Sequence, residues 1–462
     1  MVLVLISFLV SVAAVWLVLP MVNSFTGQEL DFRSLLSYQV ILASLGLILI
    51  MALLSGIYPA IYLSRLQLID ALRGRMVKLS IGNQYLRKGV VILQFSISIA
   101  LIISTLTMYR QLQYASTKNL GYQKENIICI SLYRLILGEN FNWVTKVQTF
   151  KSELLSHPDI VAVSASSGIP SSLGWSNIPT WEGQDENDNP FFYRMIVDYD
   201  FLDLYNIEIK DGRNFSRHMG TDDGHAYILN NAAVERLGFQ SPVGAKFGFD
   251  GQLGIVVGVT NDFYFESLHK PITPIGIGVK DDFICHFISI RIRNNNIPKI
   301  MDHIEDAWKN FVPATPLDYS FFDERLERLY GKERQLTKSM NYLSLMALII
   351  SCLGIFGLMS FSLKERTKEI GIRKVMGASF VRLLRLILWD IVSIIGIAAV
   401  VGGILGWYIS ADWLKNFACR FSLGINVIII AFIFTFFVAM IPLSLILVKS
   451  VSTNPANSLR TE

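Results

Sequence analysis

Charged residues are scarce in this sequence. Asp, Glu, Lys and Arg make up 17% of its 462 residues, whereas hydrophobic residues make up 52% and the mean hydropathy is +0.44. The net charge of +4 is small, and no basic tract is interleaved with aromatic residues, so nucleic acid is not an expected partner. This composition favours an integral membrane protein over a water-soluble one.

Motifs of common catalytic and metal sites are also missing. The sequence has no GxxxxGK(S/T) phosphate-binding loop, no GxSxG nucleophile elbow and no HExxH zinc motif. We therefore expect no ATPase motif, no resident cofactor and no metal site in this chain. The carboxylate pairs Asp222-Asp223 and Asp281-Asp282 are typical of solvated turns rather than of a catalytic dyad. An outward-facing enzyme anchored by helices stays open as a hypothesis without a supporting motif.

The sequence contains only four cysteines, Cys129, Cys285, Cys352 and Cys419, and none shows CxxC or metal-ligand spacing. Cys352 lies inside an apolar run, which is typical of a packing residue. Cys129 and Cys285 could form a disulfide in an oxidising compartment, but the sequence does not decide this.

Long apolar runs are what the sequence does contain. A helix needs about 20 apolar residues to cross the roughly 30 Å hydrocarbon core of a bilayer. Six segments meet or approach this length: 1–20, 38–62, 89–109, 340–363, 386–408 and 427–448. The chain starts inside such a run, at MVLVLISFLV, which suggests the C-terminal part of a longer or split protein.

The distribution of Lys and Arg predicts the orientation of these helices. The loops 64–88 and 364–385 are rich in cations, whereas the loops 21–37 and 409–426 contain few. Cation-rich short loops face the cytoplasm. With six spans, the long region between the third and fourth segments is then extracytoplasmic, and the C-terminus is cytoplasmic.

The long extracytoplasmic region has a mixed α/β pattern. Runs rich in β-branched residues predict strands at 126–132, 160–166, 254–259 and 287–292. Apolar residues at helical spacing predict helices around 143–156, 231–238 and 297–310. Asp211-Gly212 and Asp250-Gly251 are turn signals. The predicted fold is an α-helical membrane protein with six transmembrane helices and a large mixed α/β extracytoplasmic domain.

The fifth apolar segment contains one acidic residue and a pair of spaced glycines. Asp390 lies near its cytoplasmic end, where pairing with Arg382 or Arg385 is favoured over a role inside the membrane. Gly402 and Gly406 form a GxxxG pattern, which lets helices approach closely. Packing within one bundle and dimerisation both remain open for these glycines.

A short cationic segment, KERTKEIGIRKVMGAS at 364–379, separates the fourth and fifth apolar runs. If 369–385 is helical, one apolar stripe contains Ile372, Val375, Met376 and Leu383. Glycines within the segment weaken such a helix, so something external should order it. Docking in a groove of a partner protein and lying on anionic lipid are both compatible with this pattern.

KERTKEIGIRKVMGAS resembles the signature R-T-K/R-E-I-G-I-R-K-x-x-G-A of ABC-transporter permeases of the FtsX/MacB family. Other stretches resemble the MacB-like periplasmic core domain of this family, especially its Bacteroidetes-type members: VDYDFLDLYNIEIKDGRNFS (197–216), ILNNAAVERLGFQSPVGAKF (228–247), GIVVGVTNDFYFESLHKPITP (254–274) and DYSFFDERLERLYGKERQ (318–335). The resemblance covers about 40–462.

The resemblance implies a permease subunit that couples ATP hydrolysis by a separate ABC ATP-binding subunit to movement of its periplasmic domain. It implies a multi-pass protein of the bacterial inner membrane, in contact with lipid, that handles an exported molecule such as a lipoprotein or peptide. A permease dimer, a missing N-terminal half and a periplasmic adaptor are further implied partners. The implied ATPase-coupling residues are Glu369, Ile370, Gly371, Ile372, Arg373, Lys374, Gly377 and Ala378.

The resemblance also implies a division of the chain. The parts are the last two helices of a first FtsX-like unit (1–63), a cytoplasmic linker (64–88), a transmembrane helix (89–111), a MacB-like periplasmic core domain (112–337) and an FtsX-like domain with three helices (338–462). An alternative function is a non-transporting regulator of an envelope protein, such as a cell-wall hydrolase.

Overall fold

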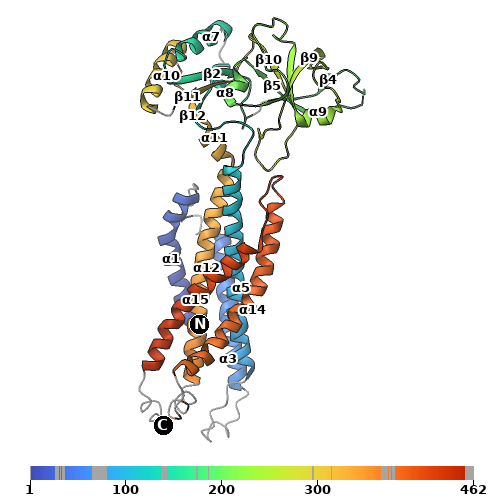
Figure 1. The fold of residues 1–462 in the computed structure, drawn as a ribbon. Coiled ribbons are helices and arrows are strands. Elements are labelled where there is room, and N and C mark those ends of the chain that lie inside the picture. The colour runs from blue at the N-terminus through green and yellow to red at the C-terminus, as the bar shows by residue number, and fades with distance from the viewer. Residues whose placement is uncertain are drawn as a thin grey trace. The chain divides into compact units, whose positions relative to one another are not determined.

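The computed structural model describes residues 2–26, 31, 33, 37–64, 81–136, 143–172, 175–185, 187–293, 296–313, 315–365, 373, 376 and 380–452. The chain forms two compact units (Figure 1). We call residues 1–109, 333–412 and 423–462 the helical unit, and residues 110–332 and 413–422 the α/β unit.

Long helices make up the helical unit. They are α1 (Val2–Thr26), α3 (Tyr38–Ser64), α5 (Ile81–Thr117), α12 (Gly331–Glu365), α14 (Phe380–Leu414) and α15 (Ile425–Ser452). Four of them, α5, α12, α14 and α15, are long and apolar enough to cross a membrane. They coincide with the third to sixth predicted spans, so these four predictions are confirmed.

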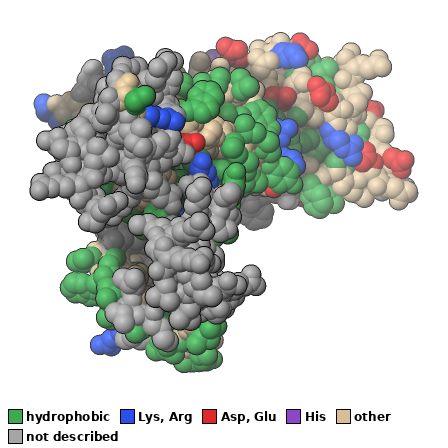
Figure 2. All heavy atoms as spheres, turned by 90° about the horizontal axis from the view of Figure 1, so that it is seen from below, with side chains coloured by type: hydrophobic (Ala, Val, Ile, Leu, Met, Phe, Trp, Pro, Cys, Tyr) green, Lys and Arg blue, Asp and Glu red, His purple; other side chains and the backbone are tan. Residues whose placement is uncertain are grey.

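Helices also form at the first two predicted spans, as α1 and α3. Within the described residues their apolar stretches, Val4–Leu17 and Tyr38–Leu53, are shorter than a span requires. Four of the described helices are therefore long and apolar enough to span a membrane, and the count of six spans stays a prediction. Many large apolar side chains on these helices are exposed, including Leu9, Leu42 and Leu353. Figure 2 shows hydrophobic side chains at the surface beside the charged ones.

A 12-stranded sheet organises the α/β unit. Its strands are β1 (Ile127–Ser131), β2 (Ile160–Ser166), β3 (Trp175–Asn177), β4 (Pro179–Trp181), β5 (Phe192–Val197), β6 (Ile209–Gly212), β7 (Ala226–Asn230), β8 (Lys246–Phe249), β9 (Gln252–Thr260), β10 (Ile275–Val279), β11 (Phe287–Ile292) and β12 (Tyr319–Phe321). Their order is β12-β1-β11-β2-β5-β10-β7-β9-β8-β4, with β3 also paired to β5 and β6 to β9. The pairs β5–β10 and β7–β9 are parallel. The four predicted strands correspond to β1, β2, β9 and β11.

Helices of the α/β unit are α6 (Tyr133–Ile136), α7 (Trp143–Leu154), α8 (Phe201–Tyr205), α9 (Asn231–Leu237), α10 (Ile297–Phe311) and α11 (Phe322–Leu329). The three predicted helices correspond to α7, α9 and α10. Helix α10 buries Ile300, Ile304 and Trp308 at the predicted helical spacing. Local signals fix the ends of α9, because the Asn230 side chain accepts a hydrogen bond from Ala233 N and Gly238 has a φ of 70°.

The two predicted turns have different outcomes. Asp250 and Gly251 join β8 to β9 with φ values of 57° and 75°, as a type I′ hairpin requires. Asp211 and Gly212 instead belong to the end of β6, where the register shifts against β9. Gly212 still needs its positive φ of 79°, and an added Cβ would lie 2.4 Å from the Val257 carbonyl oxygen.

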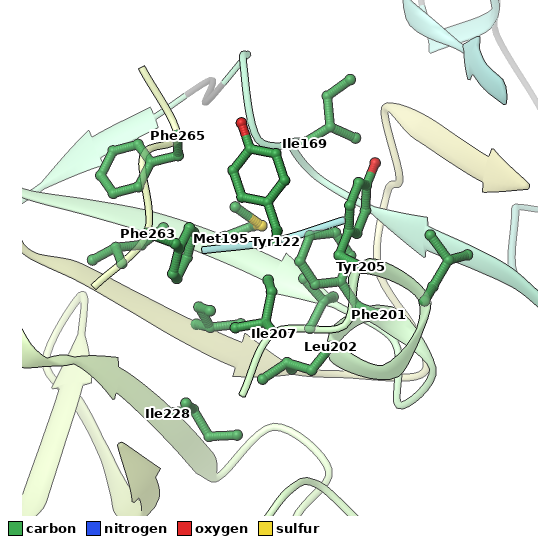
Figure 3. Packing of buried hydrophobic residues seen from close by; sticks show 14 of the residues in the cluster. Tyr122, Ile169, Met195, Phe201, Leu202, Tyr205, Ile207, Ile228, Phe263 and Phe265 are labelled. Atoms are coloured by element: carbon green, nitrogen blue, oxygen red, sulfur yellow. The ribbon is translucent and has the colours of Figure 1, made fainter. Parts of the chain in front are cut away.

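The main core of the α/β unit gathers aromatic residues from several elements. Tyr122, Phe201, Tyr205 and Phe263 are buried there together with Met195 of β5 (Figure 3). The rings of Tyr122 and Tyr205 meet edge to face, with centroids 6.4 Å apart. A second core lies between β1, β2, β11 and the helices α7 and α10.

The two faces of strand β10 pack against different side chains. Ile275, Ile277 and Val279 point into the main core. Gly276 and Gly278 alternate with them, and a Cβ at Gly276 would lie 2.9 Å from the rings of Phe247 and Phe249. The sequence IGIGV therefore packs aliphatic side chains on one face and leaves room for aromatic rings on the other.

Candidate functional site

The predicted coupling segment lies between α12 and α14 in the chain. Within it, the structure describes Arg373 as helical and Met376 as part of a turn, and both are exposed, Met376 by 82%. The remaining predicted coupling residues lie outside the described residues: Glu369, Ile370, Gly371, Ile372, Lys374, Gly377 and Ala378.

Gly402 and Gly406 lie where α14 contacts α5 of the same chain. A Cβ at Gly402 would be 2.5 Å from the Ser96 carbonyl oxygen, and one at Gly406 would be 3.0 Å from the Ala100 Cα. The Ser96 hydroxyl donates hydrogen bonds to the carbonyls of Ile92 and Ala398, which also links the two helices. The absence of a side chain at Gly402 thus lets two backbones approach within the helical unit.

Asp390 forms an ion pair with Lys88 of α5, with 3.6 Å between Oδ1 and Nζ. The partners predicted from the sequence, Arg382 and Arg385, have side chains outside the described residues. A partner on another helix was not predictable, because local spacing reports only neighbours along α14. The adjacent Arg87 guanidinium lies 4.0 Å from the centroid of the Phe361 ring. These contacts join α5 to both α12 and α14.

A buried charge cluster holds α7 against the sheet in the α/β unit. Lys151 of α7 is 3% exposed, and its ammonium lies 2.5 Å from Asp198 Oδ2, whose residue is 2% exposed. Asp198 also accepts hydrogen bonds from Ser164 Oγ at 2.6 Å and from Ala165 N at 2.8 Å. Sequence reasoning did not find this cluster, because its members are far apart in the chain and carry no motif.

Asp200 extends the Lys151 cluster toward the surface. Its carboxylate lies 2.9 Å from the Lys151 ammonium and 3.0 Å from the Arg217 guanidinium. Partial burial acts to raise the pKa of Asp200, but the Lys151 and Arg217 cations outweigh it and lower the pKa. The polar atoms of the cluster bond one another. We therefore interpret the cluster as holding α7 against the sheet rather than as a reactive site.

The prediction that Asp222 lies in a solvated turn is wrong. Asp222 is 1% exposed and forms a two-point ion pair with Arg213, with both N–O distances at 2.7 Å. It also accepts a hydrogen bond from Ser216 N at 3.0 Å. Asp222 is buried because the chain between Arg213 and Asp222 folds back on itself. Short-range sequence patterns do not report such a contact. Its neighbour Asp223 is exposed, as are Asp281 and Asp282.

The Arg213–Asp222 pair predicts a pH-dependent stability. The hydrogen bonds from Arg213 lower the pKa of Asp222 below its ordinary 3.8. A lowered pKa contributes stability above the ordinary value, and this contribution is lost as the pH falls through the lowered pKa. We therefore expect Arg213→Met to lower the melting temperature strongly at pH 7, and the difference from wild type to shrink below about pH 4.

Thermal unfolding of the purified chain at several pH values measures this effect. Arg236→Met is the matched control, because Arg236 pairs with Asp188 at the surface, where both side chains are well exposed. It should change the melting temperature little at any pH. A difference between Arg213→Met and wild type that is the same at pH 7 and pH 3 would contradict the assignment.

The cysteines and histidines considered as possible disulfide or metal-binding residues lie in the α/β unit. Cys129 and Cys285 are free and buried, and burial raises their pKa values to about 11 and about 12. The disulfide considered from the sequence does not form. The rings of His157 and His303 lie 5.1 Å apart between α7 and α10. Among the described residues, no group of three His, Cys, Asp or Glu side chains could hold a metal ion.

A cavity of about 780 Å³ opens on the face of the sheet that carries the β10 glycines. Its lining includes Gly278, Tyr227 and Ile196 together with the charged residues Arg194 and Lys280. Arg194 is engaged in an ion pair with Asp250 and also faces the Phe249 ring. The cavity combines polar and apolar walls, and its lining also includes the acidic residues Asp223 and Asp282.

Two family models match separate parts of the sequence. Residues 90–284 match the family "MacB-like periplasmic core domain", and residues 341–455 match "FtsX-like permease C-terminal". Together the two ranges cover more than half of the chain. The first range falls mainly on the α/β unit, and the second contains most of α12 and all of α14.

Relatives with assigned names are export proteins. The Macrolide export ATP-binding/permease protein MacB of Neisseria gonorrhoeae is 24% identical over 223 residues, 46% of this chain and 34% of that protein. The Pyoverdine export ATP-binding/permease protein PvdT of Pseudomonas fluorescens is 26% identical over 240 residues, 45% of this chain and 35% of that protein. The chain thus spans about a third of the length of these relatives.

The solved structures that match part of this chain include the periplasmic region of MacB from Actinobacillus actinomycetemcomitans. It is 13% identical, covers 46% of this chain and 97% of that chain, and has a TM-score of 0.34.

Proposed function

The chain belongs to the FtsX/MacB family of permeases, and on this basis we propose that it is the permease subunit of an ABC transporter. ATP is hydrolysed by a separate ATP-binding subunit, and the α/β unit is the periplasmic domain that moves in response. The movement drives export, efflux, or handling of a lipoprotein or peptide. The named relatives combine ATP-binding and permease functions in one protein, whereas this sequence contains no phosphate-binding loop.

One observation carries the proposal: helix α5 continues without a break from the helical unit into the α/β unit. The boundary between the units falls after Tyr109, and α5 runs from Ile81 to Thr117. A helix is a hydrogen-bonded rod, so a displacement at one end is passed to the other with little loss. The long segment of the α/β unit also begins at Arg110, on this helix, and ends at Lys332, in the first turn of α12.

Polar groups inside the helical unit support movement of the α/β unit over passage of a substrate between the helices. Thr105 and Ser344 bond each other at 3.0 Å, and Ser96 bonds main-chain carbonyls. These contacts satisfy the Thr105, Ser344 and Ser96 hydroxyl groups within the bundle, and the apolar spans contain few charged residues that could line a hydrophilic path. The substrate is then moved by the periplasmic domain rather than through the helices.

The proposed arrangement in the cell follows from the cation-rich loops. The chain lies in the bacterial inner membrane with six spans, the C-terminus in the cytoplasm and the α/β unit in the periplasm. The coupling segment 364–379 docks on the ATP-binding subunit. A second permease copy or a missing N-terminal half completes the membrane part, and a periplasmic adaptor is a further partner.

Arg373→Glu tests the proposed coupling. Reversing this exposed charge beside the exposed Met376 should weaken docking of the segment on the ATP-binding subunit. Charged groups at an interface steer the partner and fix its register. We expect at least a tenfold loss of the ATPase stimulation that the chain gives to the ATP-binding subunit copurified from membranes. The level of membrane-inserted protein should stay unchanged.

Lys299→Glu, at an exposed lysine of α10, is the control for a general effect of charge reversal. It should leave copurification and ATPase stimulation at the wild-type level. Equal stimulation by wild type and Arg373→Glu would remove the coupling role from this segment. Failure of the wild-type chain to bind any ATP-binding subunit would reject the proposed function as a whole.

A further inference from the structure

The loop between α14 and α15 is part of the α/β unit. Residues 413–422 belong to that unit, whereas the preceding residues of α14 and the following residues of α15 belong to the helical unit. The chain therefore passes between the two units at four places rather than at the two expected from the sequence. A loop between two membrane helices does not need such contacts, since it can remain solvated at the surface.

Gln111 of α5 anchors this loop through both ends of its side-chain amide. Its Nε2 donates to the Cys419 carbonyl at 2.9 Å, and its Oε1 accepts from Phe421 N at 3.0 Å. Gln111 is fully buried. One side chain thus satisfies a backbone acceptor and a backbone donor of the loop, which fixes the loop in one register.

The segment 263–270 of the α/β unit holds the other side of the loop. Ala418 N donates to the His269 carbonyl at 3.3 Å, and Cys419 N donates to the Leu268 carbonyl at 3.2 Å. The Phe417 ring is buried and stacks on the His269 ring, with centroids 4.0 Å apart. The two backbone hydrogen bonds resemble those between neighbouring strands.

Side chains from the helix ends complete the attachment. The Cys419 thiol lies 2.8 Å from the Tyr264 hydroxyl. It also lies 3.4 Å from the ammonium of Lys118, the residue that follows α5. The Tyr330 hydroxyl, one residue before α12, accepts a hydrogen bond from Leu268 N at 2.9 Å. The end of α5, the start of α12 and the α14–α15 loop therefore all meet at 263–270.

From this convergence we propose that loop 413–422 is a second force-transmitting connection. Movement of α14 and α15 reaches the α/β unit through the loop, with Gln111 as its anchor and 263–270 as the receiving segment. The inference rests on the proposed function, because it needs nucleotide-driven movement of the helices. It adds that the helix pair after the coupling segment acts on the α/β unit directly, and not only through α5 and α12.

Gln111→Leu tests the proposal, since leucine leaves the Cys419 carbonyl and the Phe421 N–H without their partner. The readout is hydrogen–deuterium exchange of the full chain with its copurified ATP-binding subunit, without nucleotide and trapped with ATP and vanadate. In the variant, exchange of 415–422 should be at least tenfold faster than in wild type. The nucleotide-dependent change in exchange at 263–270 should disappear, while ATP hydrolysis by the partner continues.

Gln113→Leu is the matched control, because Gln113 is exposed on the same helix. It should match wild type in both measurements. Phe417→Ala, which removes the stack on His269 without altering α5, is a second variant with the same expectations as Gln111→Leu and keeps the test valid if that variant does not fold.

Two results would overturn the inference alone: unchanged exchange of the loop in both variants, or a faster loop with the nucleotide-dependent change at 263–270 intact. If the wild-type α/β unit shows no nucleotide-dependent change anywhere, the proposed function falls and the inference falls with it.

Discussion

Lys151→Met should destabilise the α/β unit by about 3–5 kcal/mol, the usual effect of removing one partner of a buried ion pair. The substitution leaves the Asp198 carboxylate 2% exposed without its cation. Asp198 cannot turn toward solvent, because Ser164 Oγ and Ala165 N hold its oxygens at 2.6 and 2.8 Å. For a unit of this size, the loss corresponds to a melting temperature lower by about 10 °C.

Thermal unfolding of the purified chain, followed by tryptophan fluorescence, measures this loss. Lys146→Met is the control, because Lys146 is an exposed lysine of the same helix. Its melting temperature should stay close to wild type. The double variant Lys151→Met/Asp198→Asn should recover part of the loss, since a neutral amide is less costly to bury than a carboxylate. Equal melting temperatures for the two lysine variants would exclude an energetic role for the buried pair.

Gly402→Ala should have the second largest effect, although it adds only one methyl group. The new Cβ would lie 2.5 Å from the Ser96 carbonyl oxygen, a backbone atom that cannot move without moving α5. Overpacking of this kind typically costs about 1–3 kcal/mol. Separation of the helices would also lengthen the Ser96–Ala398 hydrogen bond, now 3.3 Å.

Gly403→Ala offers a closely matched control for the packing at Gly402. A Cβ at Gly403 would lie 3.5 Å from Ile428 Cγ2, an ordinary contact, and the helix propensity gained from alanine is the same at both positions. Gly403→Ala should therefore equal or exceed wild type in melting temperature in detergent, whereas Gly402→Ala should fall below it. If both variants melt together, the α5–α14 contact is not tight in the folded protein.

The local patterns of the sequence predicted the long helices, four of the twelve strands and three helices of the α/β unit. Four apolar runs became α5, α12, α14 and α15, because a continuous apolar stretch of this length has few other stable environments. β-Branched runs became β1, β2, β9 and β11, and helical spacing in 297–310 became the buried stripe of α10. These signals depend on neighbours within a few residues, which is why they can be read from the chain alone.

Contacts between distant residues were missed for the same reason. Asp390 meets Lys88 of α5, a partner that local spacing along α14 does not report, and Asp222 is buried against Arg213 rather than solvated. The burial of a charged side chain depends on the segments that pack around it, and the local sequence does not contain this information. Likewise, GxxxG showed that a close helix contact was available at Gly402, but only the structure identified α5 as the neighbour.

By itself, the sequence determined that the chain is a membrane protein with an inserted α/β region, and its motifs pointed to the permease family that comparison then established. Hydrophobicity, strand and helix periodicity and short motifs are local properties, so they are written directly in the order of residues. Only the tertiary structure decided that Gln111 holds the 413–422 loop, some 300 positions away in the chain, and joined that loop to the α/β unit. Such a contact depends on how the whole chain packs, and a hydrogen bond between a side chain and a backbone group so far away in the chain has no signature in sequence spacing.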